Sequence, residues 1–184
     1  MTATEYVQLK AFARIDGFRL SLLWAVSFAC YIAGLNSPGW TLAAAGMSLF
    51  SLLFVARCLK SFRDVAREGI ISFMRGWAFV ILVFFYAGIL FALLQYVYFT
   101  YLDQGYLLRM LQQMTATPEA QQMISQYGMG DTINENLRLL QTMRPIDMSL
   151  NLLSTNIMLG IVLGAPIAAF VKSDTAKANK EHQS

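Results

Sequence analysis

The sequence predicts an all-α integral membrane protein with four transmembrane helices. Of its 184 residues, 57% are apolar and only 14% are charged, against about 25% charged residues in an ordinary soluble domain. Four apolar stretches are long enough to cross the roughly 30 Å hydrocarbon layer, which takes about 20 helical residues. The alternating short strands of a membrane barrel are not found. Because only helices and closed barrels satisfy their backbone hydrogen bonds in lipid, the four stretches must be helical.

The predicted spans are residues 18–35, 40–56, 77–102 and 148–171. Arg19 lies close enough to the end of the first span for its side chain to snorkel to the interface. The tight polar turn Asn36-Ser37-Pro38-Gly39 makes the first two spans an antiparallel pair. We expect the first span to be retained rather than cleaved as a signal peptide, and residues 1–184 to form a single membrane domain.

Lysine and arginine are unevenly distributed between the two sides of the predicted spans. Eleven of the 14 lie before or at the start of the first span, between the second and third spans, or in the tail at 172–184. The other three lie in the long segment 103–147. By the positive-inside rule, both termini are therefore expected in the cytoplasm and the segment 103–147 outside it.

The 45-residue segment 103–147 is predicted to be helical, because a structureless loop of this length is unusual. Apolar residues recur in it at three- and four-residue spacing in three stretches. Thr117 with Pro118 marks the start of the second helix, Gly128 ends it, and Asp131 is expected to cap the third. Such short helices must lie on the membrane surface, pack on one another or cover a partner. The candidate partner surface consists of Leu111, Met123, Ile124, Leu137 and Leu140.

A metal site or a catalytic acid–base pair in this segment is a weaker interpretation than a surface for packing or partner binding. Six of the ten methionines lie between Met110 and Met148. Thioether ligands suit copper(I), but adaptable apolar packing explains the methionines better. Asp131 and Glu135 would share a helix face and could form an acid–base pair, although the segment holds no histidine or cysteine to complete a site. We therefore expect no enzymatic activity, no metal and no cofactor, and a net charge of +3 is too small for nucleic-acid binding.

Small residues mark faces for helix packing inside two of the spans. Gly160 and Gly164 form a GxxxG motif, which permits close backbone contact between helices. The full face of the fourth span is Asn156, Gly160, Gly164 and Ala168, and a similar face of the first span is Ser21, Ala25, Ala29 and Ala33. The two faces could pack on each other within one chain, which we favour, or could form a homodimer or receive a partner subunit. The centres of the predicted spans hold no Asp, Glu, Lys, Arg or His, unlike those of most transporters.

The connection between the second and third spans is basic, and Gly69 is predicted to break a short helix within it. Near anionic lipid each basic residue contributes on the order of 1 kcal/mol. The candidate contacts to lipid headgroups are Arg57, Lys60, Arg63, Arg67 and Arg75. The same residues are explained if they fix this connection on the cytoplasmic side of the membrane. The alternative is a binding site for a polyprenyl or phospholipid phosphate.

This connection also resembles the signature of a known family. Phe62-Arg63-Asp64 followed by Gly69-Ile70-Ile71-Ser72-Phe73-Met74-Arg75-Gly76 is similar to the pattern of the domain-of-unknown-function 4199 family, small four-span inner-membrane proteins of Bacteroidota. The resemblance covers nearly the whole chain. It implies a bacterial inner (cytoplasmic) membrane and a membrane glycosyltransferase as a candidate partner, but no established activity. Glu68 stands where the family often has the first of two glycines, so no special backbone turn is expected there.

These observations favour a non-enzymatic accessory or scaffold subunit in the lipid bilayer that binds a membrane or envelope protein. The alternative is a small transporter or flippase-like component for a lipid or weakly polar solute. A solid bundle with an exposed apolar outer face would favour the first hypothesis. A hydrophilic cavity lined by Asn156, Gln95 and tyrosines would favour the second.

The distribution of basic residues generates a prediction about topology. In a background in which Cys30 and Cys58 are replaced, Gln112→Cys and Gln183→Cys should be labelled from opposite sides of the membrane. The measurement is labelling of intact spheroplasts with a membrane-impermeant maleimide. Labelling of both single-cysteine variants would reject the predicted orientation.

Overall fold

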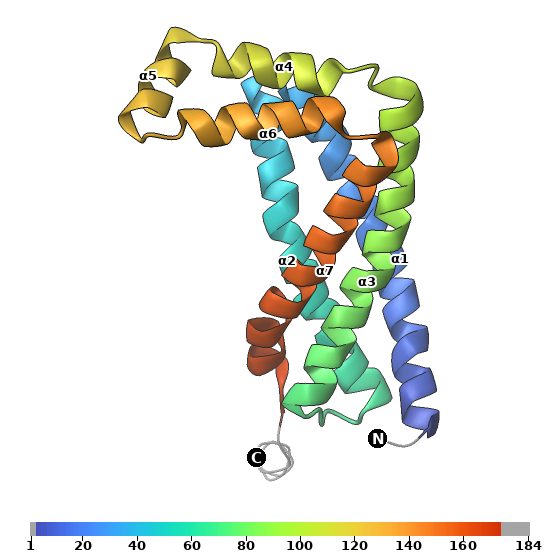
Figure 1. The fold of residues 1–184 in the computed structure, drawn as a ribbon. Coiled ribbons are helices and arrows are strands. Elements are labelled where there is room, and N and C mark those ends of the chain that lie inside the picture. Colours follow the sequence, from blue (N-terminus) through green and yellow to red (C-terminus); the bar gives the residue numbers. More distant parts are fainter. Residues whose placement is uncertain (1–2, 174–184) are drawn as a thin grey trace. The chain divides into compact units, whose positions relative to one another are not determined.

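The computed structural model describes residues 3–173, and every regular element within that range is helical (Figure 1). The four long helices are α1 (Ala3–Gly34), α2 (Pro38–Ala66), α3 (Phe73–Val97) and α7 (Pro145–Val171). A π-helical turn, η1 (Tyr98–Leu102), continues α3, and the three short helices are α4 (Tyr106–Thr115), α5 (Pro118–Gln126) and α6 (Gly130–Thr142). The all-α class is thereby confirmed. Of the predicted tail at 172–184, residues 174–184 lie outside the described part.

The four long helices are long and apolar enough to cross a membrane, and they extend beyond the predicted spans. The candidate spans of the structure are Glu5–Gly34, Gly39–Ala66, Phe73–Leu102 and Pro145–Val171. The first differs most from the prediction, which began at Phe18. Leu9, Ala13 and Leu20 are buried on one face of α1. The helical spacing of apolar residues therefore continues into the residues before Phe18, although the high average hydropathy of the predicted span does not.

The described chain divides into two compact units. The first contains residues 3–92 and 153–173 and therefore α1, α2, most of α3 and most of α7. The second contains residues 93–152, with η1, α4, α5 and α6. The buried apolar core described next belongs to the first unit.

In the first unit the long helices run side by side around a core rich in aromatic rings (Figure 1). Phe62 of α2 stacks on Phe79 of α3 with 4.7 Å between ring centroids. Trp24 of α1 meets Phe84 of α3 edge to face at 5.5 Å. Such pairs contribute roughly 0.5–1.5 kcal/mol beyond their buried area. Other buried members of the core are Leu9, Ala13, Leu20, Val55, Leu59, Val80, Val83, Ala87 and Ala168.

The small-residue face of α7 packs against α3. A Cβ atom added at Gly160 would lie 2.5 Å from the Cβ of Phe84, and one added at Gly164 would lie 3.0 Å from Cδ1 of Trp77. Farther along the same face, Ala168 lies against Gly76 and Asn156 against Gly88. The indole N–H of Trp77 also donates a 2.9 Å hydrogen bond to the carbonyl of Ile161.

The expected contact between the small-residue faces of the first and fourth spans is therefore wrong. In the structure α1 contacts α2 through Ser27, whose hydroxyl donates to the carbonyl of Ala44 at 3.1 Å. It approaches α3 through Gly17, where an added Cβ would lie 2.8 Å from the Cβ of Tyr86. In the structure the space beside the glycines of α7 is occupied by Phe84 and Trp77 of α3, so the tight contact of this face is with α3 and not with α1.

The ends of the short helices match the sequence prediction at one helix and differ at another. The Thr117 hydroxyl accepts the Ala120 N–H at 3.3 Å and caps α5 as predicted. Asp131 is not the N-cap of α6, because the helix begins at Gly130 and Met129 occupies the capping position. Asp131 lies instead in the first turn, where its charge still interacts favourably with the helix dipole.

The end of α2 contains a backbone turn that the sequence analysis did not expect. Glu68 has a φ of +51° and Gly69 a φ of +83°, so both lie in the left-handed region. For a residue other than glycine this conformation costs about 1–2 kcal/mol. The expectation that no special turn forms here is thus wrong: the turn forms with Glu68 in place of a first glycine, and the Gly69 N–H closes it on the Arg63 carbonyl at 3.1 Å.

The contact between α7 and α3 generates the second prediction. Gly160→Leu should overpack the interface and lower the stability by about 1–3 kcal/mol, measured by thermal or denaturant unfolding in detergent. Gly46→Leu is the matched control, since Gly46 is also helical but has nothing within 4 Å of its added Cβ. Equal stability of the two variants would show that Gly160 is not at a tight contact.

Candidate functional site

The first unit has a charged junction where α1 begins, α2 connects to α3 and α7 ends (Figure 1). Glu5 of α1 accepts hydrogen bonds from two guanidinium groups, that of Arg67 at the end of α2 and that of Arg75 in the first turn of α3. Its Oε1 is 2.8 Å from Nη1 of Arg67 and its Oε2 is 3.3 Å from Nη2 of Arg75. The carboxylate of Glu5 therefore holds the first turns of α1 against both sides of the Glu68-Gly69 turn.

The same connection also holds the end of α7. Arg63 donates from Nη1 to the carbonyl of Val171 at 2.9 Å and from Nε to Asp64 at 2.7 Å. Ile71 and Ser173 exchange two backbone hydrogen bonds of 3.3 and 3.2 Å. The Arg63 guanidinium thus satisfies a carbonyl in the last turn of a helix, where no intrahelical donor is present.

The structure separates the five predicted lipid contacts into two groups. Arg63, Arg67 and Arg75 hold protein groups in the junction, and the Arg67 side chain is only 11% exposed. Its Nη2 atom is buried without a hydrogen-bond partner in the described part of the chain. Arg57 and Lys60 are exposed and stay candidates for contact with lipid headgroups.

In the second unit α4 and α6 run antiparallel beside each other, and α5 connects them (Figure 1). No residue of these three helices is buried. Of the predicted partner surface, Met123 is exposed, whereas Leu111, Ile124, Leu137 and Leu140 are half-buried. The large apolar side chains that are exposed on these helices and their connections, here named the apolar loop surface, are Met114, Met123, Tyr127, Met129 and Leu139.

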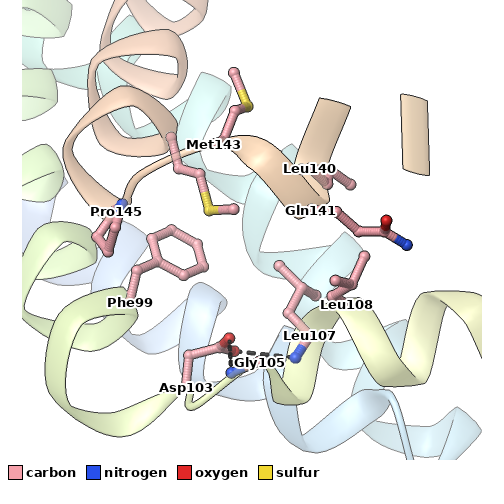
Figure 2. Close-up of a pocket in the computed structure, with 10 residues that line it drawn as sticks. Phe99, Asp103, Gly105, Leu107, Leu108, Leu140, Gln141, Met143 and Pro145 are labelled. Atoms are coloured by element: carbon pink, nitrogen blue, oxygen red, sulfur yellow. Dashed lines mark hydrogen bonds between the residues drawn. The ribbon is translucent and has the colours of Figure 1, made fainter. Parts of the chain in front are cut away.

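A pocket of about 200 Å³ lies between η1, the start of α4 and the end of α6 (Figure 2). Its walls are mostly apolar, and Asp103, which is 8% exposed, supplies a carboxylate. The lining residues are Phe99, Asp103, Gly105, Leu107, Leu108, Leu140, Gln141, Met143, Pro145 and Met148.

The chain turns sharply at Asp103 to enter α4, and this turn orients the carboxylate. Gln104 and Gly105 have φ values of +44° and +76°. The N–H groups of Gly105 and Leu107 donate to Oδ2 and Oδ1 of Asp103, both at 3.0 Å. Asp103 therefore caps α4 and lines the pocket at the same time.

Sequence reasoning missed several polar groups of both units. Asp16 is buried in the first candidate span, where it pairs with Arg19 at 3.3 Å. It was missed because the predicted span began two residues later. Asp103 was counted only as one acid of the loop, although the Asp103-Gln104-Gly105 sequence before an apolar helix is a local signal for a turn. Neither Glu5 nor its two arginine partners carry any signal of pairing in their spacing.

Residues 16–173 match the model of a family described as protein of unknown function (DUF4199). The chain belongs to this family. Comparison with curated proteins and with solved structures finds no match. The residues on which the sequence resemblance rested include Arg63, Ile71, Arg75 and Gly76, and the structure places all four where the first unit joins its helices.

The junction generates the third prediction. Glu5→Gln should lower the stability by about 1–2 kcal/mol, because it leaves the buried Arg67 guanidinium without its counter-charge. The loss should be smaller than the roughly 3–5 kcal/mol of a fully buried pair, since the Glu5 side chain is 25% exposed. The measurement is unfolding in detergent. Glu135→Gln, at an exposed helix position, is the control and should change stability by less than about 0.5 kcal/mol. Equal effects of the two variants would show that the pairing of Glu5 with Arg67 and Arg75 does not stabilise the junction.

Proposed function

We propose that this protein is a non-enzymatic accessory or scaffold subunit of a bacterial inner membrane. In this proposal it is a multi-pass protein with both termini in the cytoplasm, and the α4–α6 segment lies outside the cytoplasm. That segment binds a membrane or envelope protein, for which a membrane glycosyltransferase is the candidate that the family resemblance implies.

The observation that carries the proposal is the apolar loop surface. Met123 of α5 and Tyr127, the residue that follows this helix, are 58% and 65% exposed, and α5 contains no buried residue. Exposed apolar patches of a few hundred Å² on soluble surfaces usually mark interaction sites. Methionine suits such a surface because its flexible, polarisable side chain adapts to the shape of a partner.

The charge distribution of the first unit supports the proposed orientation. The junction gathers Arg63, Arg67 and Arg75 with the first turns of α1 and the end of α7 at one end of that unit. Basic residues beside spans favour the cytoplasmic side. The exposed Arg57 and Lys60 add to the same bias.

A small transporter or flippase-like component is the second candidate, and buried polar groups favour it. Ionisable residues within spans commonly mark paths of ions or substrates, and Asp16 is such a residue in the first candidate span. Gln95 on α3 is 3% exposed, and its side-chain oxygen has no hydrogen-bond partner among the described residues.

The fourth prediction tests the partner surface by photo-crosslinking in living cells. A photoreactive amino acid at position 123 should capture one discrete membrane or envelope protein, and Tyr127→Gln should abolish this product because Tyr127 belongs to the same surface. The double variant Met123→Gln and Tyr127→Gln should also fail to rescue the deletion phenotype. Its melting temperature should be unchanged, because both side chains are exposed.

The control is the double variant Asp131→Asn and Glu135→Gln, which removes the only acid pair proposed for chemistry and should rescue fully. Loss of rescue by this control, with full rescue by the double glutamine variant, would contradict the proposal and indicate chemistry at the two acids. Loss of rescue by Asp16→Asn, with full rescue by the double glutamine variant, would instead favour transport.

A further inference from the structure

The pocket of the second unit contains a buried negative charge that no cation neutralises within the described residues. Asp103 accepts from two backbone N–H groups, both of them neutral donors, and it takes part in none of the ion pairs of the described chain. Arg109 is the basic residue nearest to the turn, but its Nη1 donates to the carbonyl of Gln104 at 2.9 Å. Buried charges in proteins are usually paired, so the site is complementary to a cation.

The arrangement of donors around Asp103 distinguishes between the kinds of cation. A carboxylate can accept about four hydrogen bonds, and the two backbone donors, one on each oxygen, leave one position on each oxygen. A guanidinium fork needs one position on each oxygen at the same edge of the carboxylate, whereas an ammonium group is a compact point charge that can use either position alone. The site therefore suits an ammonium group.

The walls of the pocket determine what can carry this ammonium group. Phe99, Leu107, Leu140, Met143 and Met148 line the pocket together with Asp103, and Figure 2 shows Phe99 and Leu107 beside Asp103. The volume of about 200 Å³ exceeds the roughly 150 Å³ of a cavity that accepts benzene. An unbranched aliphatic stem would contact these apolar walls along its length, as buried lysine stems do on apolar surfaces.

We propose that this pocket binds a lysine side chain of the partner protein, with the aliphatic stem against the apolar walls and the ammonium group on Asp103. The inference rests on the proposed function, because the partner supplies the lysine. The charge of the segment supports it: residues 103–147 carry five acids and three arginines, a net charge of −2 that attracts a basic surface. The pocket and the apolar loop surface both belong to the second unit, so one partner contributes the lysine and the apolar contacts.

The test compares two probes that differ only at the end of the side chain. Nα-acetyl-lysine methylamide carries the ammonium group, and Nα-acetyl-norleucine methylamide has an unbranched stem without it. Binding to the full chain in phosphatidylcholine nanodiscs is followed by saturation-transfer NMR. The lysine probe should bind about tenfold more tightly, the scale of a hydrogen bond to a charged group. Equal binding of the two probes, or no binding of either, would overturn the proposal.

Two variants assign the binding to this pocket. Asp103→Asn removes the charge and keeps one acceptor for the α4 cap, so it should abolish the preference for lysine. Leu140→Phe narrows the pocket without altering the turn at Asp103, so it should weaken both probes if the melting temperature stays unchanged. Asp131→Asn, an exposed acid outside the pocket, should leave the preference intact; an equal loss in this control would show that net charge alone attracts the probe.

A lipid ammonium group is the other source of the same chemistry, and a change of nanodisc composition distinguishes it. If phosphatidylethanolamine competes with the lysine probe, the occupant is a lipid headgroup and the assignment to a partner lysine is wrong. If the probe does not bind but crosslinking at position 123 still captures a partner, the proposed function stands and this inference falls. If crosslinking also fails, both fall.

Discussion

The close approach of α1 and α7 to α3 is the constraint on which the rest of the first unit depends. Helices in lipid gain little from the hydrophobic effect when they associate, so van der Waals contact and interhelical hydrogen bonds hold them together. Gly17 and Gly160 remove the atoms that would otherwise collide with Tyr86 and Phe84. Because α3 carries large rings at these positions, both neighbours reach its backbone closely and the aromatic core forms between them.

The charged junction holds the ends of the helices together, whereas the glycines allow the faces of the helices to pack closely. Glu5 joins α1 to the connection between α2 and α3, while Arg63 and the Ile71–Ser173 pair join the end of α7 to it. Carbonyl groups at a helix end need donors from elsewhere, and arginine supplies them from a long side chain. Arg63, Ile71 and Arg75, on which the resemblance to the family rested, thus hold the end of α7 and the first turns of α1 in this structure.

The second unit is built on a different physical principle. Its three short helices contain no buried residue, so they lack a core of the kind that surrounds Phe62 and Phe79. Their order comes from local features: the Thr117 cap, the left-handed turn at Gly105 and the hydrogen bonds to Asp103. Segments with little buried apolar surface are adaptable, which is consistent with a binding role for the apolar loop surface.

The sequence by itself determined the class of the protein, its four membrane helices and the three short helices, because hydropathy and helical periodicity are local properties of a stretch of chain. Tertiary structure alone decided that the glycines of α7 face α3, that Asp16 is buried, that Glu5 meets Arg67 and that Asp103 lines a pocket. Each of these depends on the shape or charge of a side chain distant in sequence. A periodic pattern shows which face of a helix must pack, whereas complementarity between faces selects its neighbour.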